Sequence, residues 1–181
     1  SQQKTIQTLN LLTNKPILYV ANVDEIDIQT SKRGELAEKL FKHAHENGCE
    51  AIRLSGNIEM EISTMPIEDR QMFLEEYNLA EPGLFKLIQR AYRLLGLETY
   101  FTAGEKEVRA WTVRKNTRAP GAAGVIHSDF ERGFIKAEIY HFEDLMIHKS
   151  ESALKDAGKI RLEGKNYIVK DGDVIFFKFN V

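Results

Sequence analysis

The sequence has few of the features that mark several large classes of protein. Cys49 is the one cysteine in 181 residues, which excludes an intrachain disulfide framework and a cysteine-based zinc knuckle. No apolar run approaches the roughly 18 residues of a membrane span, and residues 1–30 lack the charged-then-apolar order of a signal peptide. We therefore expect neither a membrane segment nor secretion, and the cytoplasm is the default location.

An excess of charge is also missing. Lys and Arg number 25 and Asp and Glu number 27, for a net charge of −2. Whole-chain basicity therefore gives no argument for nucleic-acid binding, and only a local basic patch could provide one. Apolar residues make up 43% of the chain, which is enough to build a core in one or two domains.

The first half of the chain has the pattern of a parallel α/β structure. Apolar spacing in 5–12 predicts that the chain opens inside or near the end of a helix. The apolar run 17–21 predicts a central parallel strand buried on both faces, and 50–54 predicts a second strand. Between them, 33–46 predicts a helix that ends at Asn47-Gly48. Its expected buried stripe is Leu36, Ala37, Leu40, Phe41 and Ala44. This order is a βαβ unit, whose crossover should be right-handed.

The second half changes character. Further helices are expected at 67–77 and 82–95, with Gly96 ending the latter. Beyond a boundary near 96–99 we expect strands at 108–113, 134–140, 166–169 and 174–179, and short helices at 122–130 and 142–148. Phe176, Phe177 and Phe179 are expected in the core, and 171–173 is expected to form a turn. The pattern predicts a compact α+β unit.

Polar residues follow both predicted parallel strands. Asn22-Val23-Asp24-Glu25 follows the first strand, and Ser55-Gly56-Asn57 follows the second. An isolated Asn-x-Asp-Glu is more often an ordinary turn. The second loop changes this interpretation, because the carboxyl ends of parallel strands meet at one sheet edge, where α/β proteins bind ligands. The pair resembles the two base-binding motifs of P-loop GTPases, usually Asn-Lys-x-Asp and Ser-Ala-Lys.

A closer resemblance covers essentially the whole chain. It is carried by Asn22–Glu25, Glu81–Leu84, Phe101–Gly104, Glu107–Thr112, Ala123–Glu131, Gly133–Ala137 and Tyr167–Val174. These segments resemble the C-terminal half of the YchF/Obg-like ATPase family. The resemblance implies that residues 1–97 are the last part of a P-loop G domain, entered from its helical insertion. It also implies that residues 98–181 are a TGS domain, a ubiquitin-like β-grasp module.

The resemblance further implies a function. The intact parent would be a ribosome-associated hydrolase of ATP, or of GTP, with Mg²⁺ ligands outside these 181 residues. This piece would supply the purine-base contacts, for which the candidate residues are Asn22, Val23, Glu25, Ser55, Gly56 and Asn57. Asn22 is expected to order the loop and contact the base, and Val23 to pack on the purine or donate backbone contacts. Ser55 to Asn57 would close the other side.

The base motif departs from the GTPase pattern. In Asn-Lys-x-Asp the last carboxylate accepts hydrogen bonds from guanine N1–H and the exocyclic amine, which adenine does not offer there. Here Glu25, one methylene longer, holds that position, and Val23 replaces the lysine. Poor guanine selectivity is expected, because a lost two-donor contact is worth several kcal/mol in discrimination. Asp24, at the third position, could restore a carboxylate to the guanine edge through a one-residue shift.

Phosphate-side chemistry has no counterpart in this sequence. A P-loop requires G-x-x-x-x-G-K-[ST], which does not occur; the nearest segment, Gly158 to Asn166, has five residues between its glycines and reads as a structural turn. We therefore predict no catalytic residue here, and neither tight nucleotide binding nor turnover by this chain alone. No metal site is predicted, because His43 and His45 point to different sides of a helix.

A cluster of cations suggests a second surface. Its members are Lys106, Arg109, Arg114, Lys115 and Arg118. They could track RNA phosphates, or they could only blunt an exposed strand edge. The family resemblance favours contact with the ribosome or structured RNA, recognised by shape and phosphates. Two alternatives remain: an RNA- or protein-binding TGS module with no nucleotide role, and a stand-alone enzyme of another kind.

Overall fold

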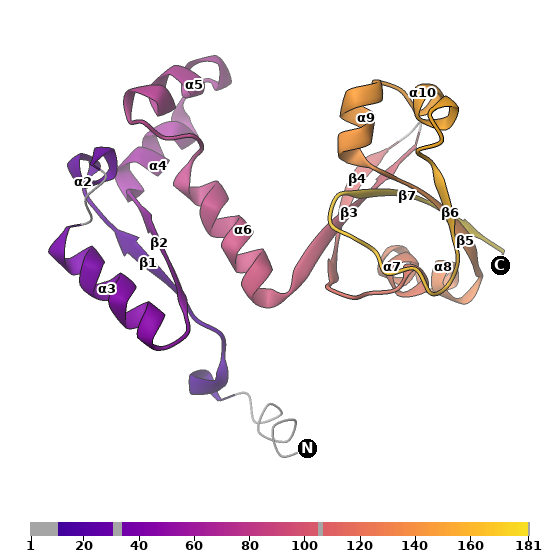
Figure 1. The fold of residues 1–181 in the computed structure, drawn as a ribbon, viewed down its shortest axis with the longest axis horizontal. Helices are drawn as coiled ribbons and strands as arrows, with labels where there is room; N and C mark the ends of the chain where they lie inside the picture. The colour runs from indigo at the N-terminus through magenta and orange to yellow at the C-terminus, as the bar shows by residue number, and fades with distance from the viewer. Residues whose placement is uncertain (1–10, 31–33, 105–106, 181) are drawn as a thin grey trace. The chain divides into compact units, whose positions relative to one another are not determined.

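The chain divides into two compact units in the computed structural model (Figure 1). The structure describes residues 11–30, 34–104 and 107–180. Unit 1 is Ser1–Leu95 and unit 2 is Gly96–Val181. Most of the helix expected at 5–12 lies outside the described residues.

Unit 1 is built on two parallel strands. Strand β1 (Leu18–Asn22) pairs with β2 (Glu50–Leu54) from Leu18↔Glu50 to Asn22↔Leu54, which confirms the predicted parallel pair. Helix α3 (Glu35–Glu46) connects them, and the chain leaves it through Gly48 at φ +65°. The remaining elements are the 3₁₀ turn η1 (Leu12–Asn14) and the helices α2 (Glu25–Gln29), α4 (Gly56–Thr64), α5 (Ile67–Glu76) and α6 (Gly83–Leu95).

Burial around these strands differs from the prediction. In β1 only Ala21 is buried, and Val20 is 40% exposed, so the expectation of a strand buried on both faces is wrong for the described structure. The described sheet has two strands, which leaves one edge of each unpaired. On α3, Ala37 and Ala44 are buried but Leu36 is 81% exposed, so the predicted stripe is too wide. The described core of unit 1 centres on Ile58, Ile62 and Leu74.

Unit 2 is a mixed five-stranded sheet with strand order β4-β3-β7-β5-β6. Its strands are β3 (Leu97–Ala103), β4 (Val108–Arg114), β5 (Phe134–His141), β6 (Arg161–Glu163) and β7 (Asp173–Phe179). Among the described strands of this unit, β3 and β7 pair in parallel and the other pairs are antiparallel. Its helices are α7 (Ala119–Ile126), α8 (Ser128–Arg132), α9 (Phe142–His148) and α10 (Glu151–Asp156).

The two faces of this sheet are covered differently. On one face Tyr100, Ala137, Ile139 and Phe177 form the main core, with Ala122 and Ala123 of α7 and Phe130 of α8 packed against them. On the other face a smaller cluster joins Tyr140 and Val174 to Leu154 of α10 and Leu145 of α9. We call these the core face and the second face.

Several predicted elements of unit 2 need correction. The strand expected at 166–169 is a loop with a single bridge from Ile168 to Arg118. The helix expected at 122–130 is two helices, because His127 is extended (φ −159°, ψ 141°) and caps α8 through Nδ1. Phe177 is buried as predicted, but Phe176 is 58% exposed, because neighbouring residues of a strand point to opposite faces. Phe179 points to the same face as Phe177 and stacks on Phe130, yet it is 37% exposed at the end of the strand. The helix at 142–148 is confirmed.

Candidate functional site

The two polar segments that follow β1 and β2 lie side by side. The register places Asn22 opposite Leu54, so both strands end at the same edge. There the Asn22 Oδ1 atom accepts a hydrogen bond of 2.9 Å from the backbone N–H of Gly56. A Cβ atom on Gly56 would lie 3.4 Å from that oxygen, at the close end of ordinary van der Waals contact. We call Asn22–Glu25 with Ser55–Asn57 the edge site.

Two further contacts join the segments. The Val23 N–H donates to the Leu54 carbonyl at 2.9 Å, and Asn57 Nδ2 donates to Glu25 Oε1 at 3.4 Å. The Val23 N–H is thus already bonded within the protein, which argues against the alternative in which it donates to a purine. Its half-buried side chain remains the part that could pack on a ring.

The second segment, Ser55–Asn57, forms the start of a helix, whereas the sequence suggested a loop. Ser55 precedes α4, and Gly56 and Asn57 are its first residues. The Ser55 side chain is only 2% exposed, so its hydroxyl is not on an open surface. The signal missed in the sequence is the four-residue spacing of Ile58 and Ile62, both of which are buried in the unit 1 core. Glu25 likewise begins a short helix, α2.

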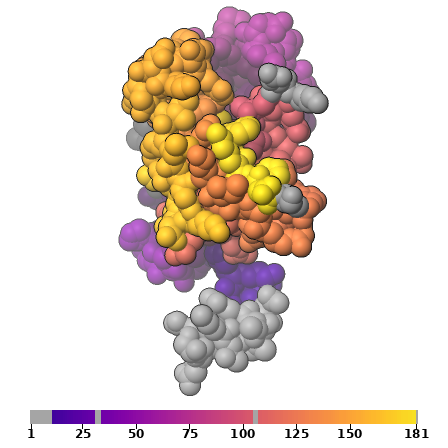
Figure 2. All heavy atoms as spheres, turned by 90° about the vertical axis from the view of Figure 1, so that its right-hand side faces the viewer, coloured from indigo at the N-terminus to yellow at the C-terminus, as the bar shows by residue number. Residues whose placement is uncertain are grey.

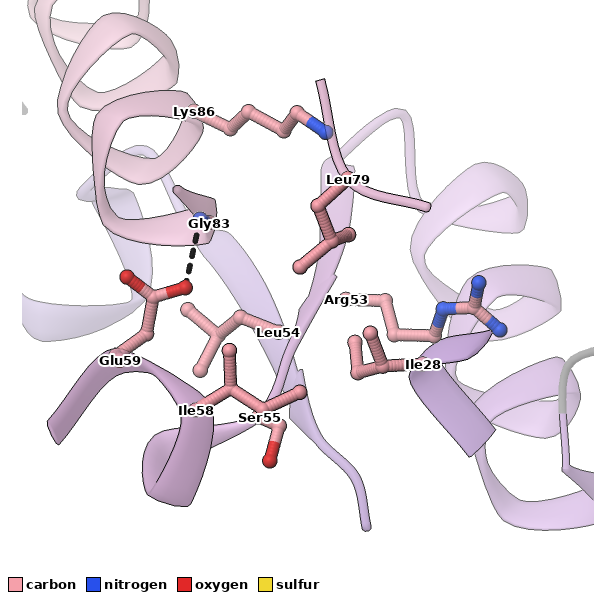
Figure 3. A pocket seen from close by; sticks show the side chains of 9 residues that line it. All are labelled: Ile28, Arg53, Leu54, Ser55, Ile58, Glu59, Leu79, Gly83 and Lys86. Atoms are coloured by element: carbon pink, nitrogen blue, oxygen red, sulfur yellow. Dashed lines mark hydrogen bonds between the residues drawn. The ribbon is translucent and has the colours of Figure 1, made fainter. Parts of the chain in front are cut away.

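Glu59 is a structural residue that sequence reasoning missed (Figure 3). Its carboxylate accepts from the N–H groups of Gly83, at 2.6 Å, and Leu84, at 3.0 Å, at the start of α6. A Cβ on Gly83 would lie 2.8 Å from both Glu59 Oε1 and Leu54 Cβ, so α6 can begin there only with glycine. Glu59 therefore joins α4 to α6 behind the edge site.

The cavity beside Glu59 does not admit a ring. It is lined by Ile28, Leu54, Ser55, Ile58 and Leu79, with Arg53 and Lys86 also bordering it (Figure 3). Its accessible space is about 20 Å³, which suits one water molecule. A base bound at the edge site would therefore have to lie on its outer surface.

The cation cluster is divided by the strand that carries it. Arg109 and Arg114 are five positions apart in β4, so they point to opposite faces, and one surface cannot include both. Arg109 lies on the core-face side, 4.2 Å from the centre of the Trp111 ring. Arg114, Lys115 and Arg118 are exposed around the segment that joins β4 to α7. Lys106 lies outside the described residues.

Other chemistry finds little support in the part of the chain that the structure describes. There, no group of three His, Cys, Asp or Glu side chains is arranged to hold a metal ion. None of the described helices has the length and apolar character needed to cross a bilayer.

The two units together define a parallel βαβ segment followed by a mixed-sheet α+β module. Residues 97–180 match the family model YchF-GTPase_C, which is described as a protein of unknown function (DUF933). The chain is 53% identical over 180 residues to the ribosome-binding ATPase YchF of Bacillus subtilis, covering 99% of this chain and 49% of that protein. It is 48% identical over 181 residues to Obg-like ATPase 1 of Gallus gallus, covering 98% and 46%.

Solved structures agree. The Schizosaccharomyces pombe YchF GTPase matches with a TM-score of 0.84 and 40% identity, over 97% of this chain and 46% of that one. A GTP binding protein from Pyrococcus horikoshii, at 16% identity, shares the fold with a TM-score of 0.62, over 92% of this chain and 46% of that one. The chain belongs to the YchF/Obg-like ATPase family. It spans about half the length of the curated relatives it matches.

Proposed function

We propose that this chain is the base-binding and RNA-binding part of a ribosome-associated, YchF-like nucleotide hydrolase. Residues 1–97 would be the C-terminal part of the G domain and 98–181 a TGS domain. The observation that carries the proposal is the hydrogen bond from Gly56 N–H to Asn22 Oδ1, which holds two polar segments together at the carboxyl edge of parallel strands.

The geometry of Asn22 suits a base contact. Its Oδ1 atom orders the two segments, while no described residue accepts from its Nδ2 group. An amide N–H₂ is a donor, and purine N7 is an acceptor. Asn22 can therefore hold the loop and bind the ring at the same time, with Val23 packed against the ring.

The environment of Glu25 favours adenine over guanine. Its Oε1 atom already accepts from Asn57 Nδ2, so the carboxylate is held within the protein instead of being aimed at guanine N1–H. Asp24 is exposed and makes no side-chain cap for α2, so it is the residue through which guanine recognition would have to arise. Relatives carry both kinds of name, ATPase and GTPase.

Hydrolysis is assigned to the complete protein. These 181 residues contain no G-x-x-x-x-G-K-[ST] segment, so the phosphates and Mg²⁺ would be bound by other parts of the parent. The relatives named ribosome-binding ATPases, each about twice as long as this chain, support that division.

Unit 2 supports the second half of the proposal. Its strand order, with β3 and β7 parallel at the centre and α7 packed on one face, supports the assignment to a β-grasp module. Arg114, Lys115 and Arg118 provide exposed cations near one end of β4. Such a group can bind phosphates without reading base sequence.

The base site can be tested in the complete protein. Replacing Asn22 with alanine removes both the Gly56 hydrogen bond and the donor to the ring, so we expect ATP to bind about tenfold more weakly, or ~1.4 kcal/mol. Titration with a fluorescent ATP analogue measures this. Asn47→Ala, at the exposed end of α3, is the matched control. Unchanged ATP affinity in a folded Asn22→Ala protein would contradict the proposal.

A further inference from the structure

The second face of the unit 2 sheet contains a pocket, which we call the β7 pocket. It is lined among others by Ala103, Glu138, Tyr140, Glu151, Ile160 and Phe176 and encloses about 250 Å³. Figure 2 shows the side of the molecule on which the yellow C-terminal residues reach the surface. The volume of the β7 pocket falls below the about 300–1,000 Å³ of small-molecule sites, so the pocket suits one long side chain.

The floor and one wall of the pocket are apolar. Val174 is buried in the floor, and Ala103 and Ile160 pack against the same cluster. Phe176 is 58% exposed, although it lies in β7, between β3 and β5. The described helices of this face, α9 and α10, pack near Tyr140 and leave the Phe176 ring uncovered. The ring therefore offers an apolar contact surface.

The remaining wall is acidic. Glu138 and Glu151 both line the pocket, and the Tyr140 hydroxyl donates to Glu151 Oε1 at 2.7 Å. The Lys178 ammonium pairs with Glu138. Two carboxylates against one ammonium leave one negative charge at the pocket, carried by Glu151. Phosphate groups would be repelled there, whereas a cation would be attracted.

Lys178 shows within the protein how a basic side chain can bind to this face. The Lys178 ammonium lies 6.0 Å from the centre of the Phe176 ring while it pairs with Glu138. Long basic side chains bind in this way at partly solvated surfaces: the alkyl stem packs on an aromatic ring, and the charged group pairs with a carboxylate. Glu151 and the open part of the ring provide the same two features with no cation in place among the described residues.

We propose that the β7 pocket binds a lysine or arginine side chain presented by a protein partner, its stem on Phe176 and Ile160 and its charged group on Glu151. The pocket is separate from the edge site, and its function does not depend on nucleotide. It is also distinct from the Arg114–Arg118 cations, because it would recognise a basic protein segment and not RNA.

The test uses the ¹⁵N-labelled 181-residue chain and a short peptide, acetyl-Ala-Leu-Lys-Leu-Ala-amide. We expect saturable shifts at the amides of Ala103, Ile160 and Phe176. The same peptide with norleucine or glutamate in place of lysine should bind about fivefold more weakly, which is the upper end of the range for an exposed ion pair. Glu151→Gln should weaken the lysine peptide by a similar factor, and Phe176→Ala should abolish the shifts.

The matched control is Glu131→Gln, an exposed carboxylate on α8, which packs on the core face. It should leave the peptide affinity unchanged. Equal binding of the norleucine peptide, or no effect of Glu151→Gln, would overturn the proposal in favour of a purely apolar site. Absence of shifts, or the same shifts caused by an RNA oligonucleotide, would overturn it as well.

Discussion

Single side chains hold this molecule together at points far apart in sequence. Asn22 links two strand ends with one oxygen, and Glu59 holds the start of α6 with two. In unit 2 the fully buried Asp173 acts in the same way over a shorter stretch of chain. Its Oδ2 atom accepts from the Tyr167 hydroxyl at 2.7 Å and from the Lys170 N–H at 2.9 Å. Asp173 thus joins the start of β7 to the loop before it.

Loss of this carboxylate should destabilise unit 2. Asp173→Ala removes a buried side chain and leaves two partly buried donors without their acceptor, so we expect the free energy of unfolding to fall by about 3 kcal/mol. Tyr167→Phe removes only one donor and should cost about 1 kcal/mol. Urea titration followed by Trp111 fluorescence measures both, because this chain has one tryptophan and it packs on the core of unit 2. Equal losses for the two variants would contradict this account.

At the scale of elements, unit 2 holds three tyrosines as neutral side chains, two in its sheet and one in the loop before β7. Burial raises the pKa of Tyr100, of Tyr140 and of Tyr167 well above the ordinary value of 10.0. The neighbouring carboxylates Glu151 and Asp173 raise the pKa of Tyr140 and Tyr167 further. The folded unit therefore prefers the protonated phenols.

This preference predicts alkaline unfolding of unit 2. Below pH 10.0, the pKa of the phenols in the unfolded state, they are neutral in both states, and their full contribution to the stability of unit 2 is present. As pH rises above that value the unfolded state loses protons first, so stability falls until the folded pKa is passed. Urea midpoints read from Trp111 should drop above pH 10. The prediction would be contradicted if absorbance showed all six tyrosines ionising near pH 10 before any change in Trp111 fluorescence.

Elements with a strong local pattern were predictable. Strands β2 and β4 and helices α3, α6 and α9 lie close to their predicted ranges, because apolar period and end signals such as Gly48 and Gly96 act locally. Strand β6 was not predictable: its three residues are held by β5, a partner more than twenty positions away. Helix α4 was missed because its glycine start reads as a loop.

At the scale of the whole molecule, the proposal joins a base site in unit 1 to an RNA surface in unit 2. Charge reversal at Arg114, Lys115 and Arg118 in the complete protein should weaken ribosome binding at least about tenfold and reduce its salt dependence. Contacts with phosphates contribute to the affinity and also make the affinity depend on salt. Co-sedimentation with ribosomes measures this. Arg109→Glu is the control, because that side chain lies on the opposite face of β4. Ribosome binding unaffected by the triple change would remove the RNA surface from the proposal.

The sequence by itself determined the family, the parallel βαβ order and the candidate residues of the edge site, because these depend on local patterns and on which residue follows which strand. Only the tertiary structure decided how those residues are used. In the folded chain the Val23 N–H is bonded to Leu54 and Ser55 is buried. Arg109 and Arg114 lie on opposite faces of β4, and Phe176 is exposed beside Glu151. Each of these outcomes depends on which distant side chain packs against a given face, and a local pattern does not contain that partner.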